Sequence, residues 1–371
     1  MTANQSTPIA SDTPTVASRE PEVTKAQSGA AGTGARLLRL VLTERAAALF
    51  ILMIILVFAF MYLGNNGYLF APFNLRYMGT SLEALVPIAL LALAEMFVII
   101  SGRSGIDLSV GATVSLAGML FGYLIQHREM GVGLALVITV IFGTILGSVN
   151  GILVGYLRFP PLIATLATSY AYASLAMVLS GQSPISGPHI ARANETLASK
   201  VRIGDIPIPL QVLTVLIPMV VVSWFVLDRT AWGRSLLAIG TNDVAARYAA
   251  QRVKLVRCSA YSVSGMLCGL AAVVNVAQFA SARPDAGTAG SGMALPAITV
   301  AALGGVLIQG GFGRVSGVIT GALLVTWLNA GLLISFQGST GPRMQLLALG
   351  VILIGSILLN SFAAKKYNLR M

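Results

Sequence analysis

Residues 81–100 read SLEALVPIALLALAEMFVII and contain only two charged side chains, Glu83 and Glu95. An apolar helix of about 20 residues crosses the hydrocarbon core of a bilayer, which is about 30 Å thick. Similar apolar runs recur along the chain, and we expect spans near 46–63, 81–100, 107–125, 132–155, 161–180, 210–227, 259–279, 295–309, 315–334 and 345–361. The alternation typical of a membrane barrel is absent from these runs. The sequence therefore predicts an all-α, polytopic membrane protein with about ten transmembrane helices.

The composition agrees with this class. Of the 371 residues, 56% are apolar and 10% are charged, and the mean hydropathy is +0.82. A soluble domain has about 25% charged residues, because its surface faces water. Fibrous, disordered and disulfide-rich classes are excluded, since the 39 glycines have no collagen period and there are two cysteines.

The net charge of +11 has a simple explanation in a membrane protein. Lys and Arg are enriched in cytoplasmic loops. With the N-terminus inside and ten spans, 17 of the 24 basic residues fall on the inner side. We therefore expect both termini in the cytoplasm and no nucleic-acid partner. The two histidines are isolated in predicted loops, so the sequence predicts no metal site.

The chain divides into a few regions. Residues 1–45 are rich in Thr, Ser, Ala, Pro and Gly and predict a disordered cytoplasmic tail. Residues 46–361 form the transmembrane domain, with a periplasmic excursion at about 181–209 and a basic cytoplasmic loop at about 228–258. Residues 362–371 are expected to form a cytoplasmic C-terminal tail.

Two stretches, 86–125 and 295–334, share a pattern: an apolar run, a Gly/Arg turn and a helix with spaced small residues. Both turns fall on the inner side, which predicts two weakly similar, parallel halves, as is common in transporters. Gly313, Gly317 and Gly321 lie on one face of the later helix. They either allow close helix packing or contact the solute.

Polar residues interrupt the predicted spans. Asp107 and Ser109 lie where a span should begin, and we expect the Asp107 carboxylate either to cap that helix or to act in transport. Glu95 is deeper and has no local partner, so it should face a cavity or another chain segment. The remaining candidates line a hydrophilic pathway or join helices by hydrogen bonds: Asn150, Thr165, Asn275, Gln278 and Asn329.

Residues 232–250 read WGRSLLAIGTNDVAARYAA and lie in the basic loop. Asn242 is a suitable N-cap, Asp243 follows in the first turn, and an alanine-rich run with high helix propensity comes next. This pattern predicts a short cytoplasmic helix, which either docks a soluble partner or lies solvated at the interface. We expect Ala245, Ala246 and Ala249 to enter a cleft of the partner, and Asp243 to add only a favourable helix-start charge.

None of the five lysines follows a glycine. A phosphate-binding loop needs the pair Gly-Lys followed by Ser or Thr. We therefore expect no cofactor on this chain, and any ATP that powers it must bind to another subunit.

Four motifs together resemble the permease subunits of bacterial ATP-binding-cassette importers for ribose and related monosaccharides. They are GIDLSVG at 105–111, PPLIATL at 160–166, GRSLLAIG at 233–240 with Asn242 and the AAR at 245–247, and the glycines at 304–305, 310–313, 317 and 321. The resemblance covers about residues 70–360. It implies a second permease chain (identical or paralogous), a cytoplasmic ATP-binding subunit and a periplasmic solute-binding protein. It also implies that the loop is a coupling element, formed by Arg234, Asn242, Asp243, Ala245, Ala246 and Arg247.

The leading interpretation is a non-enzymatic permease subunit in the bacterial inner membrane that translocates a ribose-like sugar. A neutral polyol needs hydrogen-bonding groups and no fixed counter-charge, which suits the Asn, Gln, Ser and Thr in the spans. Alternatives are an importer permease for branched-chain amino acids, nucleosides or a sugar-like signal, and an ion-coupled secondary transporter. A membrane enzyme ranks last, because no nucleophile, metal or acid–base constellation is evident.

Overall fold

The computed structural model describes residues 45–289 and 292–367, which lie within one compact unit that begins at Val41. All of the expected N-terminal tail except Arg45 lies outside the described residues. The same is true of residues 368–371 of the expected C-terminal tail.

Apolar helices occur where the spans were predicted. They are α2 (Arg45–Asn65), α3 (Leu75–Ile100), α4 (Val110–Gln126), α5 (Val132–Gly151) with its π-helical extension η1 (Ile152–Tyr156), α6 (Pro161–Leu179), α8 (Ile217–Arg229) preceded by π-helical η2 (Val212–Leu216), α11 (Val253–Phe279), α12 (Ala294–Leu303), α13 (Val315–Ser335) and α14 (Thr340–Tyr367). Within the described residues, seven of these segments are long and apolar enough to cross a membrane, and α4, α12 and Thr340–Gly355 are shorter apolar helices. The predicted class of polytopic helical membrane protein is confirmed.

Several boundaries differ from the prediction. α3 begins at Leu75 rather than near residue 81, and α11 begins at Val253 rather than near residue 259. α12 ends at Leu303 rather than near residue 309, because Gly304 and Gly305 follow and Gly305 has a φ of +93°. α14 continues to Tyr367, so most of the segment expected as a tail after residue 361 is helical.

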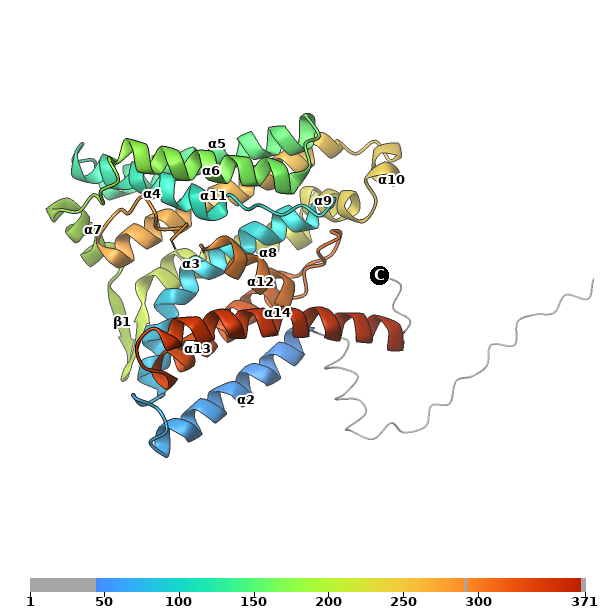
Figure 1. Ribbon diagram of the computed structural model, residues 1–371. Coiled ribbons are helices and arrows are strands. Elements are labelled where there is room, and N and C mark those ends of the chain that lie inside the picture. The colour runs from blue at the N-terminus through green and yellow to red at the C-terminus, as the bar shows by residue number, and fades with distance from the viewer. Residues whose placement is uncertain (1–44, 290–291, 368–371) are drawn as a thin grey trace, which may run out of the picture. The chain divides into compact units, whose positions relative to one another are not determined.

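The helices α3 and α11 form the centre of the bundle (Figure 1). In each, 78% of the most apolar 18-residue stretch is buried. α11 packs closely on α5 through facing glycines: a Cβ added at Gly265 would lie 2.8 Å from the Cα of Gly147. Small residues at four-residue spacing permit such close helix contact in membranes.

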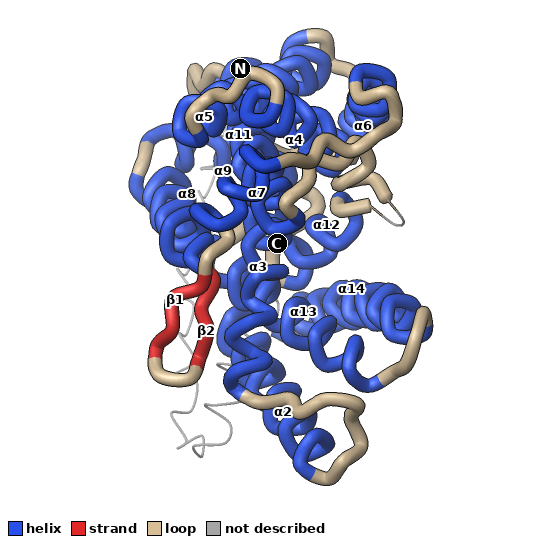
Figure 2. Tube along the Cα trace, turned by 90° about the vertical axis from the view of Figure 1, so that its left-hand side faces the viewer, coloured by secondary structure: helices blue, strands red, loops and turns tan. Residues whose placement is uncertain are grey.

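A short hairpin stands at one end of the bundle. The expected excursion contains α7 (Pro188–Leu197), β1 (Lys200–Ile203) and β2 (Ile206–Pro209), with the two strands antiparallel (Figure 2). The Lys200 ammonium lies 3.0 Å from the Glu83 carboxylate and ties β1 to α3. The prediction of an all-α chain thus needs one small addition.

The helices α9 (Ala231–Thr241) and α10 (Asp243–Tyr248) lie at the opposite end. The first residues of α2 and the last residues of α14 lie at this same end (Figure 1). This arrangement agrees with the predicted topology, in which both chain ends share one side of the membrane with the basic loop.

The two Gly/Arg turns that follow the predicted similar stretches meet at the α9 end. The Gly311 N–H donates a hydrogen bond to the carbonyl oxygen of Ile100 at 3.0 Å. Gly240 of α9 lies between the turns, and a Cβ added at Gly102 would lie 2.9 Å from its Cα. Only glycines allow three backbones to approach this closely, and Gly102 also has a φ of +82°.

Candidate functional site

The short helix α10 is the first part of the candidate site. The Asn242 side chain caps it, accepting hydrogen bonds from the backbone N–H groups of Val244 at 3.1 Å and Ala245 at 3.0 Å. The predicted N-cap is confirmed. The cap matters because α10 is only 6 residues long, and a helix of this length is marginal on its own.

The two faces of α10 differ from the expectation. Val244 is 55% exposed and Tyr248 is 90% exposed, whereas Ala246 is only 6% exposed. Ala246 belongs to the chain's own buried core, so the expectation that it enters a partner's cleft was wrong. Ala245 and Ala249 are exposed, and the surface available to a partner is the exposed side with Tyr248.

Asp243 does more than begin the helix. Its carboxylate lies 3.0 Å from Nε of Arg103 and 3.7 Å from the guanidinium of Arg257. Arg257 is buried and also donates to the carbonyl oxygen of Ser101 at 3.2 Å. The expectation that Asp243 adds only a helix-start charge was wrong, because the carboxylate joins α10 to both the 101–109 turn and α11.

The stretch before α10, which sequence reasoning had not assigned to a helix, forms α9. Thr230 caps it by accepting from the Gly233 N–H at 3.1 Å. That threonine, placed before an apolar helix-forming run, was the available signal. The other two predicted coupling residues, Arg234 on α9 and Arg247 on α10, are both exposed.

The second part of the candidate site is a buried polar network in the bundle, centred on Asp107. One carboxylate oxygen of Asp107 accepts from the Ser109 backbone N–H at 3.0 Å and from its hydroxyl at 2.6 Å. The other accepts from the Ser264 hydroxyl of α11 at 3.2 Å. The Asp107 N–H donates to Glu95 of α3 at 3.3 Å.

The helices α5 and α6 complete this network. Asn150 of α5 donates to the Ser109 hydroxyl at 2.7 Å and accepts from the Thr168 hydroxyl of α6 at 2.7 Å. The Thr165 hydroxyl, also on α6, donates to the carbonyl oxygen of Ile106 at 3.1 Å. Glu95, Asp107, Ser109, Asn150 and Thr165 were candidates from the sequence, and the structure brings them together.

Asp107 does not cap α4 directly. The helix begins at Val110, its N-cap is Ser109, and no side chain caps it. The carboxylate instead closes a turn on Ser109, two residues later. The capping alternative for Asp107 is therefore replaced by a role in the buried network.

The network has unfilled hydrogen-bonding capacity. Among the described residues, Oε1 of Glu95 and the Tyr261 hydroxyl are buried and have no hydrogen-bond partner. Buried polar groups are usually paired, so these two atoms are the places in the network where a further hydrogen bond can form.

A hollow of about 240 Å³ lies beside this network. Leu108, directly before Ser109, and Gly111, two residues after it, contribute to its wall, and hydroxyl-bearing side chains line it at Ser169, Tyr170 and Thr288. None of its lining residues in the described part of the chain is charged.

Other candidates lie away from the network. Gln278 of α11 donates hydrogen bonds to the backbone carbonyl oxygen of Glu83 at 2.7 Å and to the side-chain oxygen of Gln211 at 2.8 Å. Asn275 is buried with an unpaired side-chain oxygen. The backbone oxygen of Asn329 accepts from Gln345 at 2.8 Å.

The candidate glycines of α13 make packing contacts. A Cβ added at Gly317 would meet the backbone of Gly304, and one at Gly321 would lie 3.2 Å from the carbonyl oxygen of Val300 on α12. A Cβ at Gly313 would lie 2.7 Å from the Ile100 side chain.

Together, the helical bundle, its buried polar network and the exposed helix α10 define an integral membrane protein of the transporter class. Residues 77–357 match the family described as the branched-chain amino acid transport system / permease component, and the chain belongs to this family.

Several relatives are named autoinducer 2 import system permease protein LsrD. The protein of Yersinia enterocolitica is 35% identical over 256 residues, covering 68% of this chain and 74% of the relative. The protein of Enterobacter sp. strain 638 is 34% identical over 284 residues, covering 76% of this chain and 84% of the relative. The protein of Escherichia coli K12 is 34% identical over 263 residues, covering 70% of this chain and 77% of the relative. No solved structure matches the chain.

These findings confirm the resemblance to importer permease subunits and the assignment to the inner membrane as a multi-pass protein. The relatives are permease subunits, in keeping with a transport role. Their names refer to autoinducer 2 import and not to ribose.

Proposed function

We propose that this chain is the transmembrane subunit of an ATP-binding-cassette importer that carries a small, uncharged, sugar-like solute into the cell. A signal of the autoinducer 2 type is favoured over ribose, because the relatives are autoinducer 2 import permeases. The expected partners are a cytoplasmic ATP-binding subunit, a periplasmic solute-binding protein and a second permease chain.

The observation that carries the proposal is the attachment of α10 to the interior. The Asp243 carboxylate binds Arg103 at 3.0 Å, and Arg103 belongs to the same turn as Asp107 and Ser109. A displacement of α10 by a docked ATP-binding subunit would therefore move the 101–109 turn. This turn forms part of the buried network and of the hollow's wall, so ATP-driven motion outside the membrane would reach the solute pathway.

The hollow supports the solute class. Its hydroxyl groups at Ser169, Tyr170 and Thr288 offer donors and acceptors, and its described lining residues carry no charge. A polyol is held by hydrogen bonds alone, whereas a free amino acid also needs partners for its ammonium and carboxylate groups. The lining thus favours a sugar-like solute over a branched-chain amino acid.

Reconstitution tests this function. The permease, the ATP-binding subunit and the solute-binding protein encoded beside it are placed in liposomes, with ATP on the side of the ATP-binding subunit. We expect ATP-dependent uptake of radiolabelled autoinducer 2, with ribose as the second candidate and leucine as the negative control. Uptake of leucine but of neither sugar-like solute would contradict the proposed solute class, and uptake without ATP would contradict the mechanism.

A matched pair of variants tests the role of α10. Tyr248→Ala removes the 90% exposed aromatic side chain, and Tyr68→Ala removes a 71% exposed tyrosine in the loop after α2. We expect only Tyr248→Ala to reduce ATP-dependent uptake at equal amounts of inserted protein. Equal uptake by the two variants would count against α10 as the docking element.

A further inference from the structure

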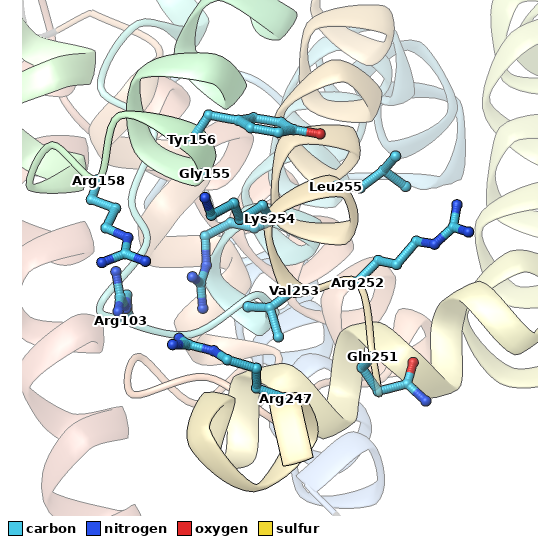
Figure 3. Close-up of a pocket in the computed structure, with 11 residues that line it drawn as sticks. Arg103, Gly155, Tyr156, Arg158, Arg247, Gln251, Arg252, Val253, Lys254 and Leu255 are labelled. Atoms are coloured by element: carbon cyan, nitrogen blue, oxygen red, sulfur yellow. The ribbon is translucent and has the colours of Figure 1, made fainter. Parts of the chain in front are cut away.

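A second concavity, apart from the hollow, opens at the α10 end. It has a volume of about 400 Å³ and lies between η1, α10 and the first turn of α11. Six of its lining residues are basic: Arg103, Arg158, Arg247, Arg252, Lys254 and Arg257. Figure 3 shows Arg103, Arg158 and Arg247 among the side chains that line this pocket.

The positive charge of this basic pocket is only partly balanced. Within the described residues, Asp243 forms ion pairs with Arg103 and Arg257, and no carboxylate pairs with the other four basic side chains. Cations held close together repel one another, and the repulsion is relieved when an anion binds between them. Arginine forks match the oxygens of phosphate groups particularly well.

The backbone is arranged unusually around the pocket. Arg103 and Arg158 both have a φ of +59°, in the left-handed region that non-glycine residues seldom occupy. η1 is a π-helical segment, a feature found frequently at functional sites. Strained backbone of this kind is concentrated in ligand clamps and active sites, where the surrounding structure holds it in place.

The rim of the pocket is apolar and faces outward. Tyr156 and Leu255 line the pocket and are 44% and 48% exposed, while the neighbouring Leu157 and Phe159 are 60% and 49% exposed. In a membrane protein, exposed apolar side chains of this kind contact lipid, and tyrosine is enriched at the depth of the headgroups. The basic pocket therefore opens where the phosphate headgroups of the cytoplasmic leaflet lie.

We propose that the basic pocket binds the phosphate headgroup of an anionic phospholipid from the cytoplasmic leaflet. Basic pockets between transmembrane helices on this side of the membrane are suited to such headgroups. The pocket includes Arg247 of α10 and Arg103, the ion-pair partner of Asp243. A bound headgroup would thus stabilise α10 in the position from which it contacts a partner. This inference requires only the inner-side placement of α10 and does not depend on the transported solute.

Native mass spectrometry of the full-length permease, extracted from vesicles of phosphatidylglycerol or of phosphatidylcholine, tests the inference. The wild-type protein should retain phosphatidylglycerol and not phosphatidylcholine. The double variant Arg158→Gln/Lys254→Gln should bind phosphatidylglycerol more weakly by about fivefold for each charge removed. Arg202→Gln, on the exposed outer hairpin, should leave binding unchanged, and Arg158→Lys should retain most of it because the charge remains.

Three outcomes would overturn the proposal. Equal retention of the two lipids would exclude headgroup recognition by charge. Unchanged phosphatidylglycerol binding in the double variant would place the lipid elsewhere. Displacement of the lipid by inorganic pyrophosphate at micromolar concentration would identify the ligand as a soluble phosphate and not a membrane lipid. Thermal unfolding of each variant checks that it remains folded. If the double variant is unstable, the single change Arg158→Gln makes the same comparison against Arg158→Lys, and equal phosphatidylglycerol binding by these two would also overturn the proposal.

Discussion

Substitution of Asp243 by asparagine tests the attachment of α10 to the rest of the chain. The change preserves size and the possibility of a hydrogen bond but removes the charge that faces Arg103 and Arg257. Sequence reasoning predicted a mild effect of about 0.3–1 kcal/mol from the helix start alone. The structure predicts a larger one.

The magnitude follows from the exposure of the three side chains. Arg103 is 43% exposed, so its pair with Asp243 is screened by solvent and contributes about 0.2–1 kcal/mol. Arg257 is only 3% exposed, and loss of its counter-charge leaves a buried cation with one carbonyl acceptor. Breaking a fully buried pair costs about 3–5 kcal/mol. Asp243 is 17% exposed, and asparagine still accepts a hydrogen bond. We therefore expect Asp243→Asn to destabilise the packing of α10 on the rest of the chain by about 2 kcal/mol.

Hydrogen–deuterium exchange of the full-length protein in nanodiscs measures this local effect. A loss of about 2 kcal/mol corresponds to exchange about 30-fold faster in the amides of α10. The matched control is Asp205→Asn in the turn of the exposed hairpin, which should leave exchange in α10 unchanged. If Asp243→Asn exchanges at the wild-type rate in α10, the two ion pairs do not hold this helix.

Three further substitutions follow from the packing. Gly240→Ala places a Cβ against the Ile100 carbonyl oxygen at the end of α3 and should sharply reduce the yield of folded protein. Gly350→Ala, which has open space around it, should leave the yield unchanged. Similar yields would contradict the close contact of Gly240 with the two glycine turns. Asn150→Ala removes the two hydrogen bonds that join the 101–109 turn to α6 through α5. It should cost about 1–3 kcal/mol, seen as a lower thermal midpoint in detergent; an unchanged midpoint would show that the network does not stabilise the bundle. Ala246→Glu buries a charge in the core and should reduce the amount of protein inserted in the membrane. Ala245→Glu, on the exposed face, should leave that amount unchanged but reduce co-purification of the ATP-binding subunit. The reverse pattern would contradict the assigned faces of α10.

The positions of the helices could be predicted because the signal is local. An apolar run of about 20 residues identifies a span wherever it packs, and Asn242 followed by a helix-forming stretch identifies a capped helix. The β-hairpin was missed, although Gly204-Asp205 between Val201-Arg202-Ile203 and Ile206-Pro207-Ile208 is a turn between two short strand-like runs.

The contacts between helices could not be predicted, because they depend on helix rotation. Asp107 and Asn150 were each recognised as unusual within an apolar run, but Ser264 and Thr168 looked like ordinary small residues of membrane helices. Their roles appear only once α5, α6 and α11 face the 101–109 turn. For the same reason Ala246 was assigned to the partner-facing side of α10, when its side chain points into the core.

Cysteine cross-linking at α10 shows whether an ATP-binding subunit docks on this helix. In a background with Cys258→Ser and Cys268→Ser, Tyr248→Cys is treated with a short thiol-to-amine cross-linker in membranes that contain the whole importer. We expect a product that joins the permease to the ATP-binding subunit, and no such product from Tyr68→Cys. Co-purification of the ATP-binding subunit without any cross-link from position 248, or an equal cross-link from position 68, would contradict this docking.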